Sequence, residues 1–237
     1  MSGSLGFRDP PRVVLGVTGS VAAVRLPLLY RGLIDAGMRV RIVATRHAGY
    51  FFDPADLPAP EYDPDRAFVD HQPGGPLFGD DDEWPGDRRR DRDEEVRHIA
   101  FRDWADLLLV APLDAHTLAK FAYGFADNFL SCIYRAWDFR RPVVLAPAMN
   151  TRMWDSPVTR RQFATLLADH AISEPPGRWT LDEVAAVFAT HAPGLVVIPP
   201  IEKRLACGDV GIGAMAEVDA IVATVVATVE RQSPKSS

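Results

Sequence analysis

Short apolar runs alternate with helical patterns along most of the chain, and this alternation limits the possible folds more than any other feature. The runs are rich in β-branched residues and carry no alternating polar positions, which is typical of strands buried on both faces of a parallel sheet. Helices between such strands cover both faces of the sheet. The sequence therefore predicts an α/β fold with a doubly wound parallel sheet. We expect strands at 13–17, 40–44, 107–111, 143–146 and 195–198, and helices at about 21–36, 115–136, 157–168 and 217–229.

The composition suits one large domain. Of the 237 residues, 47% are hydrophobic and 24% are charged, so we expect a single domain at 12–231 between flexible tails at 1–11 and 232–237. The net charge of -6 disfavours nucleic acid or an anionic membrane as a partner. No apolar run approaches the ~20 residues of a membrane span. Two cysteines make no disulfide scaffold, so we expect the cytoplasm.

Two segments interrupt the alternation. Residues 58–97 are rich in proline, glycine and charge, and include the acidic run 80–83 and the basic run 88–90. Such a segment is either a lid or a solvated loop, and the composition favours the loop. In the second segment, 173–193, Thr180 and Glu183 have the spacing of a capping box. We therefore expect a short additional helix there.

Small or polar residues follow four of the expected strands. Gly19 and Ser20 lie in a turn of small residues that opens the first helix, where a phosphate can meet backbone N–H groups. The spacing is not that of a dinucleotide fingerprint, so a single phosphate, as in a mononucleotide, or an ordinary tight turn fits better. The other three strand ends carry Thr45, the segment 114–117 and the segment 147–150. Because the carboxyl ends of parallel strands meet at one edge, these groups predict a ligand site.

Cys207 lies in a segment with three glycines in seven positions, which predicts a mobile, irregular stretch. A thiol there can reach a substrate as a proton donor or nucleophile. Cys132 lies on an apolar helical pattern and is expected in the core. His98 precedes a helical pattern and, taken alone, fits a surface or capping histidine.

Together these residues resemble the flavin-containing cysteine decarboxylases, most closely the stand-alone, eukaryote-like phosphopantothenoylcysteine decarboxylases. The resemblance is carried by His98-Ile99, by Pro147-Ala-Met-Asn-Thr-x-Met-Trp154 and by Ala206-Cys-Gly-Asp209, within matching stretches at 16–27, 98–128, 132–138, 142–154 and 203–217. It implies a flavodoxin-like or Rossmann-like fold in three α/β/α layers with bound FMN. It also implies a homo-oligomer, a trimer or a dodecamer of trimers, with active sites at subunit interfaces.

The resemblance also implies roles for individual residues. The expected catalytic residues are His98, Asn150 and Cys207. The positions that match FMN contacts are Gly19, Ser20, Val21, Thr45, Asp114, Ala115, His116, Thr117 and Ala148. Those that match substrate contacts are Asn150, Met153, Arg204, Ala206 and Met215, the last three in a substrate flap at 203–217. No metal is implied.

The implied chemistry is a decarboxylation made easier by oxidation. FMN oxidises the –CH2–SH group of a cysteine to a thioaldehyde, which gives the electrons of the breaking C–C bond an acceptor. His98 assists proton removal, and Asn150 orients the carboxylate. Reduced FMN then returns a hydride while Cys207 supplies the proton. With phosphopantothenoylcysteine the product is 4'-phosphopantetheine, a precursor of coenzyme A.

Three departures from the family pattern leave alternatives open. His116 replaces the usual asparagine near FMN, Ala100 replaces an acidic residue, and 180–191 looks like an insertion. These changes fit a peptidyl-cysteine decarboxylase that forms a C-terminal aminoenethiol on a ribosomally made peptide. The presence of Cys207 favours the full reductive cycle over this alternative. A third possibility is an inactive flavin-binding regulatory subunit, against which His98, Asn150 and Cys207 argue.

Overall fold

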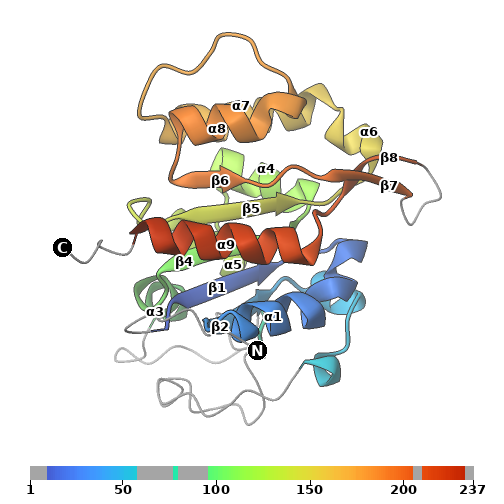
Figure 1. The fold of residues 1–237 in the computed structure, drawn as a ribbon, viewed down its shortest axis with the longest axis vertical. Helices are drawn as coiled ribbons and strands as arrows, with labels where there is room; N and C mark the ends of the chain where they lie inside the picture. The colour runs from blue at the N-terminus through green and yellow to red at the C-terminus, as the bar shows by residue number, and fades with distance from the viewer. Residues whose placement is uncertain (1–9, 58–76, 80–95, 205–209, 233–237) are drawn as a thin grey trace.

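A six-stranded parallel sheet forms the centre of the computed structural model, which describes residues 10–57, 77–79, 96–204 and 210–232. Its strand order is β3–β2–β1–β4–β5–β6, and every pairing in it is parallel (Figure 1). The strands are β1 (Arg12–Val17), β2 (Arg39–Ala44), β3 (Leu77–Phe78), β4 (Leu107–Leu113), β5 (Val143–Pro147) and β6 (Leu195–Val197). The prediction of a doubly wound parallel sheet is confirmed.

The order of the strands reverses beside β1. The chain runs from β1 to β2 and β3 at one edge, and then returns to form β4 on the other side of β1. Leu15 accordingly pairs with Ile42 on one side and with Leu109 on the other. In such sheets, ligands bind at the carboxyl ends of the two strands that flank the reversal. We therefore expect a ligand site at the carboxyl ends of β1 and β4.

Helices cover both faces of the sheet and make a three-layer sandwich (Figure 1). Alternate residues of β1 serve two cores: Leu15 packs with the face covered by α1 and α9, and Val14 packs with the opposite face. One face carries η1 (Val21–Arg25), α1 (Leu26–Asp35) and α9 (Val218–Gln232). The other carries α3 (Arg97–Trp104), α4 (Ala115–Tyr123), α5 (Phe129–Arg135), α7 (Pro157–His170) and α8 (Val184–His191). Shorter helices are η2 (Ala48–Tyr50), η3 (Pro54–Asp56), α6 (Thr151–Trp154) and η5 (Leu181–Glu183).

The helical pattern predicted at 115–136 is two helices rather than one. Gly124 ends α4 in the left-handed conformation, with a φ of 73°, which favours glycine. Asn128 then begins α5 with a capping box, because its side chain accepts from the Ser131 N–H and the Ser131 hydroxyl accepts from the Asn128 N–H. The periodicity missed this break because both helices bury apolar residues in the same core.

The segments that interrupt the alternation also take part in the fold. Thr180 and Glu183 form the expected capping box, and η5 and α8 follow it. Most of 58–97 lies outside the described residues, but Leu77 and Phe78 form the edge strand β3, which was not predicted. Cys132 is buried, as expected. Within the described residues, no helix combines the length and hydropathy that a membrane span requires.

The glycine-rich segment after β6 differs from the prediction of an irregular stretch. Its described residues form an antiparallel hairpin of β7 (Ile201–Arg204) and β8 (Val210–Ala214). The glycines suggested irregular backbone because they lower strand propensity. Here they permit close packing against a neighbouring loop, which is a tertiary effect that local sequence does not reveal.

Candidate functional site

Thr18 joins the ends of β1 and β4 at the point where the strand order reverses. Its side-chain hydroxyl donates to the Pro112 carbonyl oxygen at 2.8 Å and accepts from the Asp114 N–H at 2.8 Å. Thr18 is fully buried, so both hydrogen bonds are shielded from water. The two strand ends are therefore fixed relative to each other.

The turn after β1 lies against the turn after β2. The Thr45 N–H donates to the Val17 carbonyl at 2.9 Å, which ties the end of β2 to the end of β1. A Cβ atom on Gly19 would lie only 2.7 Å from the Cβ of His47 and 3.5 Å from an Asp114 carboxylate oxygen. Glycine is thus required where three strand ends converge.

Two helices begin at this convergence. Ser20 is the N-cap of η1, where its hydroxyl accepts from the Ala22 N–H at 3.3 Å. Asp114 is the N-cap of α4, where its carboxylate accepts from the Thr117 N–H at 2.6 Å. The amino end of a helix attracts anions. Because the Asp114 carboxylate already occupies the start of α4, the turn at Ser20 is the better place for a phosphate.

The loop after β5 approaches the same edge of the sheet. The Ala148 N–H donates to the Leu113 carbonyl at 2.9 Å, so this loop continues the pairing of β5 with β4. Asn150 caps α6, where its Oδ1 accepts from the Arg152 N–H at 2.9 Å. Met153 is exposed on that helix. The loop therefore holds an amide and a thioether side chain beside the strand ends.

The β7–β8 hairpin packs against this loop through its glycines. The Met149 N–H donates to the Gly213 carbonyl at 2.9 Å. A Cβ on Gly213 would collide with the Met149 carbonyl oxygen, and one on Gly211 would lie 2.6 Å from the Thr151 hydroxyl. Gly213 also has a φ of 151°. The hairpin can lie this close only because both positions lack a side chain.

An exposed ion-pair group ties the base of the hairpin to the first helix. The Glu217 carboxylate lies 2.6 Å from Arg25 Nη1 and 3.1 Å from Lys203 Nζ. The pKa of Glu217 lies below its ordinary value. The hydrogen bond from Arg25 is the larger cause, and the hydrogen bond from Lys203 is the next. These charges are open to solvent, so they orient the hairpin more than they stabilise the fold.

Comparison with known proteins identifies the family to which this arrangement belongs. A family model described as Flavoprotein matches residues 5–230. This chain belongs to the flavoprotein family. A phosphopantothenoylcysteine decarboxylase of Mus musculus is 43% identical over 93% of this chain and 88% of its own length.

Two solved structures extend this similarity. A variant of a PPC decarboxylase in complex with pantothenoylaminoethenethiol is 38% identical, with a TM-score of 0.71 and coverage of 94% of this chain and 100% of that one. The FMN-binding protein AtHal3 is 39% identical, with a TM-score of 0.70 and coverage of 95% and 100%. The expected resemblance to the stand-alone decarboxylases is therefore confirmed, as is the three-layer α/β/α fold.

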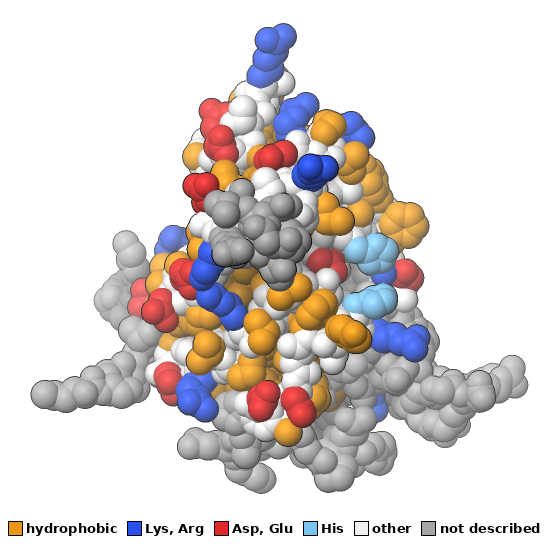
Figure 2. Space-filling model, turned by 90° about the vertical axis from the view of Figure 1, so that its right-hand side faces the viewer, with side chains coloured by type: hydrophobic (Ala, Val, Ile, Leu, Met, Phe, Trp, Pro, Cys, Tyr) orange, Lys and Arg blue, Asp and Glu red, His pale blue; other side chains and the backbone are white. Residues whose placement is uncertain are grey.

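Most of the predicted site residues of this flavoprotein lie on one edge of the sheet. Figure 2 looks onto this side, where apolar side chains lie between scattered charges and two histidines stand close together. The residues at the described strand ends are Gly19, Ser20, Val21, Thr45, Asp114, Ala115, His116, Thr117, Ala148, Asn150 and Met153. Met215 follows β8 and is buried in the same core as Ala148.

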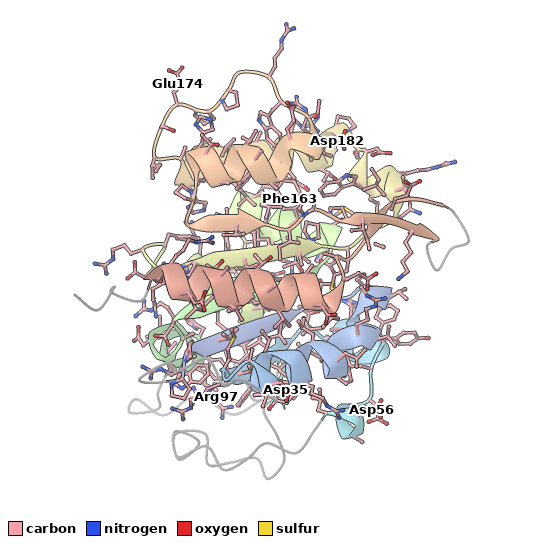
Figure 3. All side chains as sticks on the ribbon, viewed as in Figure 1. Asp35, Asp56, Arg97, Phe163, Glu174 and Asp182 are labelled. Carbon is pink, nitrogen blue, oxygen red and sulfur yellow. The ribbon has the colours of Figure 1, made fainter. Side chains whose placement is uncertain are left out.

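The remaining predicted residues are on the β7–β8 hairpin, in the 205–209 segment and on α3. Arg204 ends β7, while Ala206 and Cys207 lie outside the described residues. His98 is on α3, whose carboxyl end is fixed near the start of β5 by a hydrogen bond from Arg141 to the Arg102 carbonyl. Figure 3 places Arg97, the first residue of α3, on the side of the sheet away from the β7–β8 hairpin.

Two structural residues of the site were not predicted. Thr18 stands beside the glycine turn, and its polar side chain directly after a buried strand was an available signal. His47 follows the strand end at Thr45, but no local pattern indicates that it packs against Gly19. Both contacts join segments far apart in the sequence, and therefore only the folded sheet reveals them.

Proposed function

We propose that this flavoprotein binds FMN and decarboxylates the cysteine carboxylate of phosphopantothenoylcysteine, a cytoplasmic step of coenzyme A biosynthesis. The observation that carries the proposal is the convergence of the Ser20 turn, the Asn150 loop and the β7–β8 hairpin at one sheet edge. The phosphopantothenoylcysteine decarboxylase of Mus musculus reported above supports the choice of reaction. The PPC decarboxylase complex supports the choice of substrate.

The residues at the strand ends fit the phosphate of FMN. The Ser20 hydroxyl and the first N–H groups of η1 are small, uncharged donors, and His47 lies against the adjacent Gly19. We expect Thr45, Ala148 and the 114–117 segment to surround the rest of the cofactor. When bound, FMN would supply the two-electron oxidation of the substrate's carbon–sulfur unit that eases loss of carbon dioxide.

Asn150 would bind and orient the substrate carboxylate. Its Oδ1 accepts from the Arg152 N–H, so the group that it offers a carboxylate is the Nδ2 amide, which is a donor. Met153 would provide an apolar contact for the substrate, as would Met215, and Arg204 and Ala206 would complete the flap. A held carboxylate keeps the breaking bond aligned with the electron-accepting group.

His98 and Cys207 would move protons. His98 would accept or hold a proton during oxidation, and Cys207 would donate one when the product is reduced. We expect His98→Asn to abolish release of carbon dioxide while the protein keeps its flavin absorbance. Cys207→Ser should stop at the enethiol. Normal turnover of His98→Asn would remove His98 from the mechanism.

The position of α3 suggests that one site draws on two copies of the chain. His98 lies on a helix anchored near the amino-terminal side of the sheet, whereas Asn150 lies at the carboxyl edge. Val21, Val24 and Leu28 are 50%, 61% and 63% exposed, and this apolar stripe at the start of the first helix suits a second subunit. We therefore propose a homo-oligomer, a trimer or an assembly of trimers, with shared sites.

Subunit mixing tests this arrangement. Inactive His98→Asn and Asn150→Ala proteins are unfolded together, refolded as mixed oligomers and assayed. If each site takes His98 from one copy and Asn150 from another, some sites in the mixture regain both residues and activity returns. No recovery in a confirmed mixed oligomer would place both residues of a site on one chain.

A paired substrate assay tests the reaction itself. Purified protein should carry oxidised flavin absorbance and release carbon dioxide from phosphopantothenoylcysteine, giving 4'-phosphopantetheine. Activity only on a peptide with a C-terminal cysteine, with loss of carbon dioxide and two hydrogens, would instead show a peptidyl-cysteine decarboxylase. Flavin binding without activity on either substrate would indicate a regulatory subunit. A colourless protein that takes up no FMN would overturn the whole proposal.

A further inference from the structure

The helix that carries His98 begins without a side-chain cap. α3 begins after Val96, which makes no side-chain cap hydrogen bond. His98 lies in the first turn, beside that uncapped end. Helix termini without caps fray more readily than capped ones. Contacts made farther along α3 can therefore influence the direction of its first turn.

Arg141 fixes the opposite end of α3. Its Nη1 donates to the Arg102 carbonyl at 2.6 Å and to the Ala105 carbonyl. A cation at the carboxyl end of a helix satisfies carbonyl groups that have no partner within the helix and complements the helix dipole. Arg141 thus anchors the last turn of α3.

Arg41 contacts the face of α3 between these two ends. It comes from β2 and is buried, with 6% of its surface exposed. Its guanidinium carbon lies 4.1 Å from the ring centre of Trp104 and 5.1 Å from that of Phe101. Phe101 also meets the rings of Phe78 and Phe129 edge-on, at 4.8 and 5.0 Å. A buried cation on two rings is a directional contact, and it strengthens when it is desolvated.

The spacing of these residues connects Arg41 to His98. His98 and Phe101 are three positions apart, as are Phe101 and Trp104, so the three follow one another along a side of the helix. A rotation of α3 that moves Phe101 off the guanidinium therefore turns His98 by a similar angle. The contact with Arg41 opposes that rotation.

We infer that Arg41 is a positioning residue, which holds α3 through Phe101 and Trp104 and thereby directs the His98 imidazole. The inference rests on the proposed role of His98 in the reaction. We assign Arg41 no contact with substrate or cofactor. It acts by fixing the rotation of the helix that Arg141 anchors at its other end.

Substitutions of Arg41 distinguish a role in positioning His98 from a role in folding. In Arg41→Met, which keeps the length and loses the charge, kcat should fall about 10- to 100-fold because the imidazole is displaced. FMN absorbance should persist and KM should change by less than about threefold, since the strand-end residues are untouched. Arg41→Lys should recover part of kcat, because an ammonium keeps the cation–π attraction but not the planar stacking.

A double-mutant cycle tests whether the effect passes through His98. If it does, Arg41→Met should slow the reaction little or not at all in a His98→Gln background, which is used because His98→Asn is expected to be inactive. Phe188→Leu is the matched control, because it removes a fully buried ring from α8, which packs on β6 at the opposite edge of the sheet. That variant should lose stability without a change in kcat. An equal loss of kcat from Arg41→Met with and without His98 would overturn the inference.

Hydrogen exchange supplies a readout that does not depend on catalysis. Amides of α3 should exchange faster in Arg41→Met, while those of β1 and β4 keep their protection. This result would stand even if the wild-type protein failed to decarboxylate any substrate, in which case only the proposed function fails. Unchanged exchange in α3 would refute the positioning role. If Arg41→Met does not fold, Trp104→Leu removes one partner of the same contact and is measured in its place.

Discussion

The turn side and the hairpin side of the site are held together by different forces. On the turn side, Thr18 is fully buried and its hydroxyl makes two hydrogen bonds that join β1 to β4. On the hairpin side, Gly211 and Gly213 pack against the 149–151 loop, and exposed ion pairs of Glu217 tie the base. The first side depends on satisfied polar groups in the core. The second depends on the absence of side chains at the two glycines. It should therefore tolerate few substitutions at those positions, but moving the hairpin away from the loop should cost little free energy.

Among changes to these two sides of the site, Gly213→Ala should have the largest effect on function. The added methyl would collide with the Met149 carbonyl oxygen at a backbone conformation that favours glycine, so the hairpin must move away from the Asn150 loop. We expect kcat/KM to fall about 100-fold, because displacement of about 1 Å can cost that much. Steady-state kinetics and flavin absorbance measure it.

Gly177→Ala is the matched control for that prediction. Gly177 lies in the loop before η5, and a Cβ there would meet nothing within 4 Å. It should leave kinetics and flavin content unchanged. If both variants behave alike, the close contact of the hairpin with the loop is not what the reaction needs.

Thr18→Val should have the largest effect on stability. The replacement keeps the shape but leaves the Asp114 N–H and the Pro112 carbonyl without their buried partner. We expect the free energy of unfolding to fall by about 2 kcal/mol. Urea denaturation of the FMN-free protein measures this loss directly. Thr190→Val, which removes a hydroxyl from the exposed surface of α8, should change it little.

Asp114→Ala should weaken the turn side by a smaller amount. It removes the carboxylate that caps α4 at the Thr117 N–H, a change that costs about 1 kcal/mol. Asp53→Ala removes a similar cap from the exposed three-residue helix η3 and should cost less. Urea denaturation gives the loss in free energy of unfolding for each variant, and the comparison shows whether a cap at the strand ends contributes more than an exposed cap. Equal losses would mean that Asp114 is only a local cap.

Glu217→Gln should have the smallest effect, visible mainly at neutral pH and lost in acid. Arg25 and Lys203 lower the pKa of Glu217, so the folded state holds its proton less tightly than the unfolded chain. Such a group stabilises the fold above its ordinary pKa of 4.5, and the contribution is lost as pH falls through the lowered value. Thermal unfolding of both proteins should therefore diverge at neutral pH and converge in acid. Divergence that persists in strong acid would contradict this.

Much of the candidate site followed from where polar residues stand relative to apolar runs. Gly19, Ser20, Asp114 and Asn150 each lie within three residues of the end of a buried strand, and parallel strands bring their carboxyl ends together. The hairpin β7–β8 did not follow in the same way, because its glycines look irregular until the loop that they contact is known. Likewise, Gly124 divides a helical pattern that periodicity alone reads as continuous.

The sequence by itself determined the layered α/β architecture, the strand-end residues and the family resemblance. Each of these depends on short-range patterns: runs of buried residues, caps and motifs of a few positions. Only the tertiary structure decided that Thr18 links two strands and that Arg41 lies against the helix of His98. Thr18 and its partners are 94 or more positions apart in the sequence, and Arg41 and α3 are about 60 positions apart. No local preference encodes them, because they form only when the sheet closes and its helices pack.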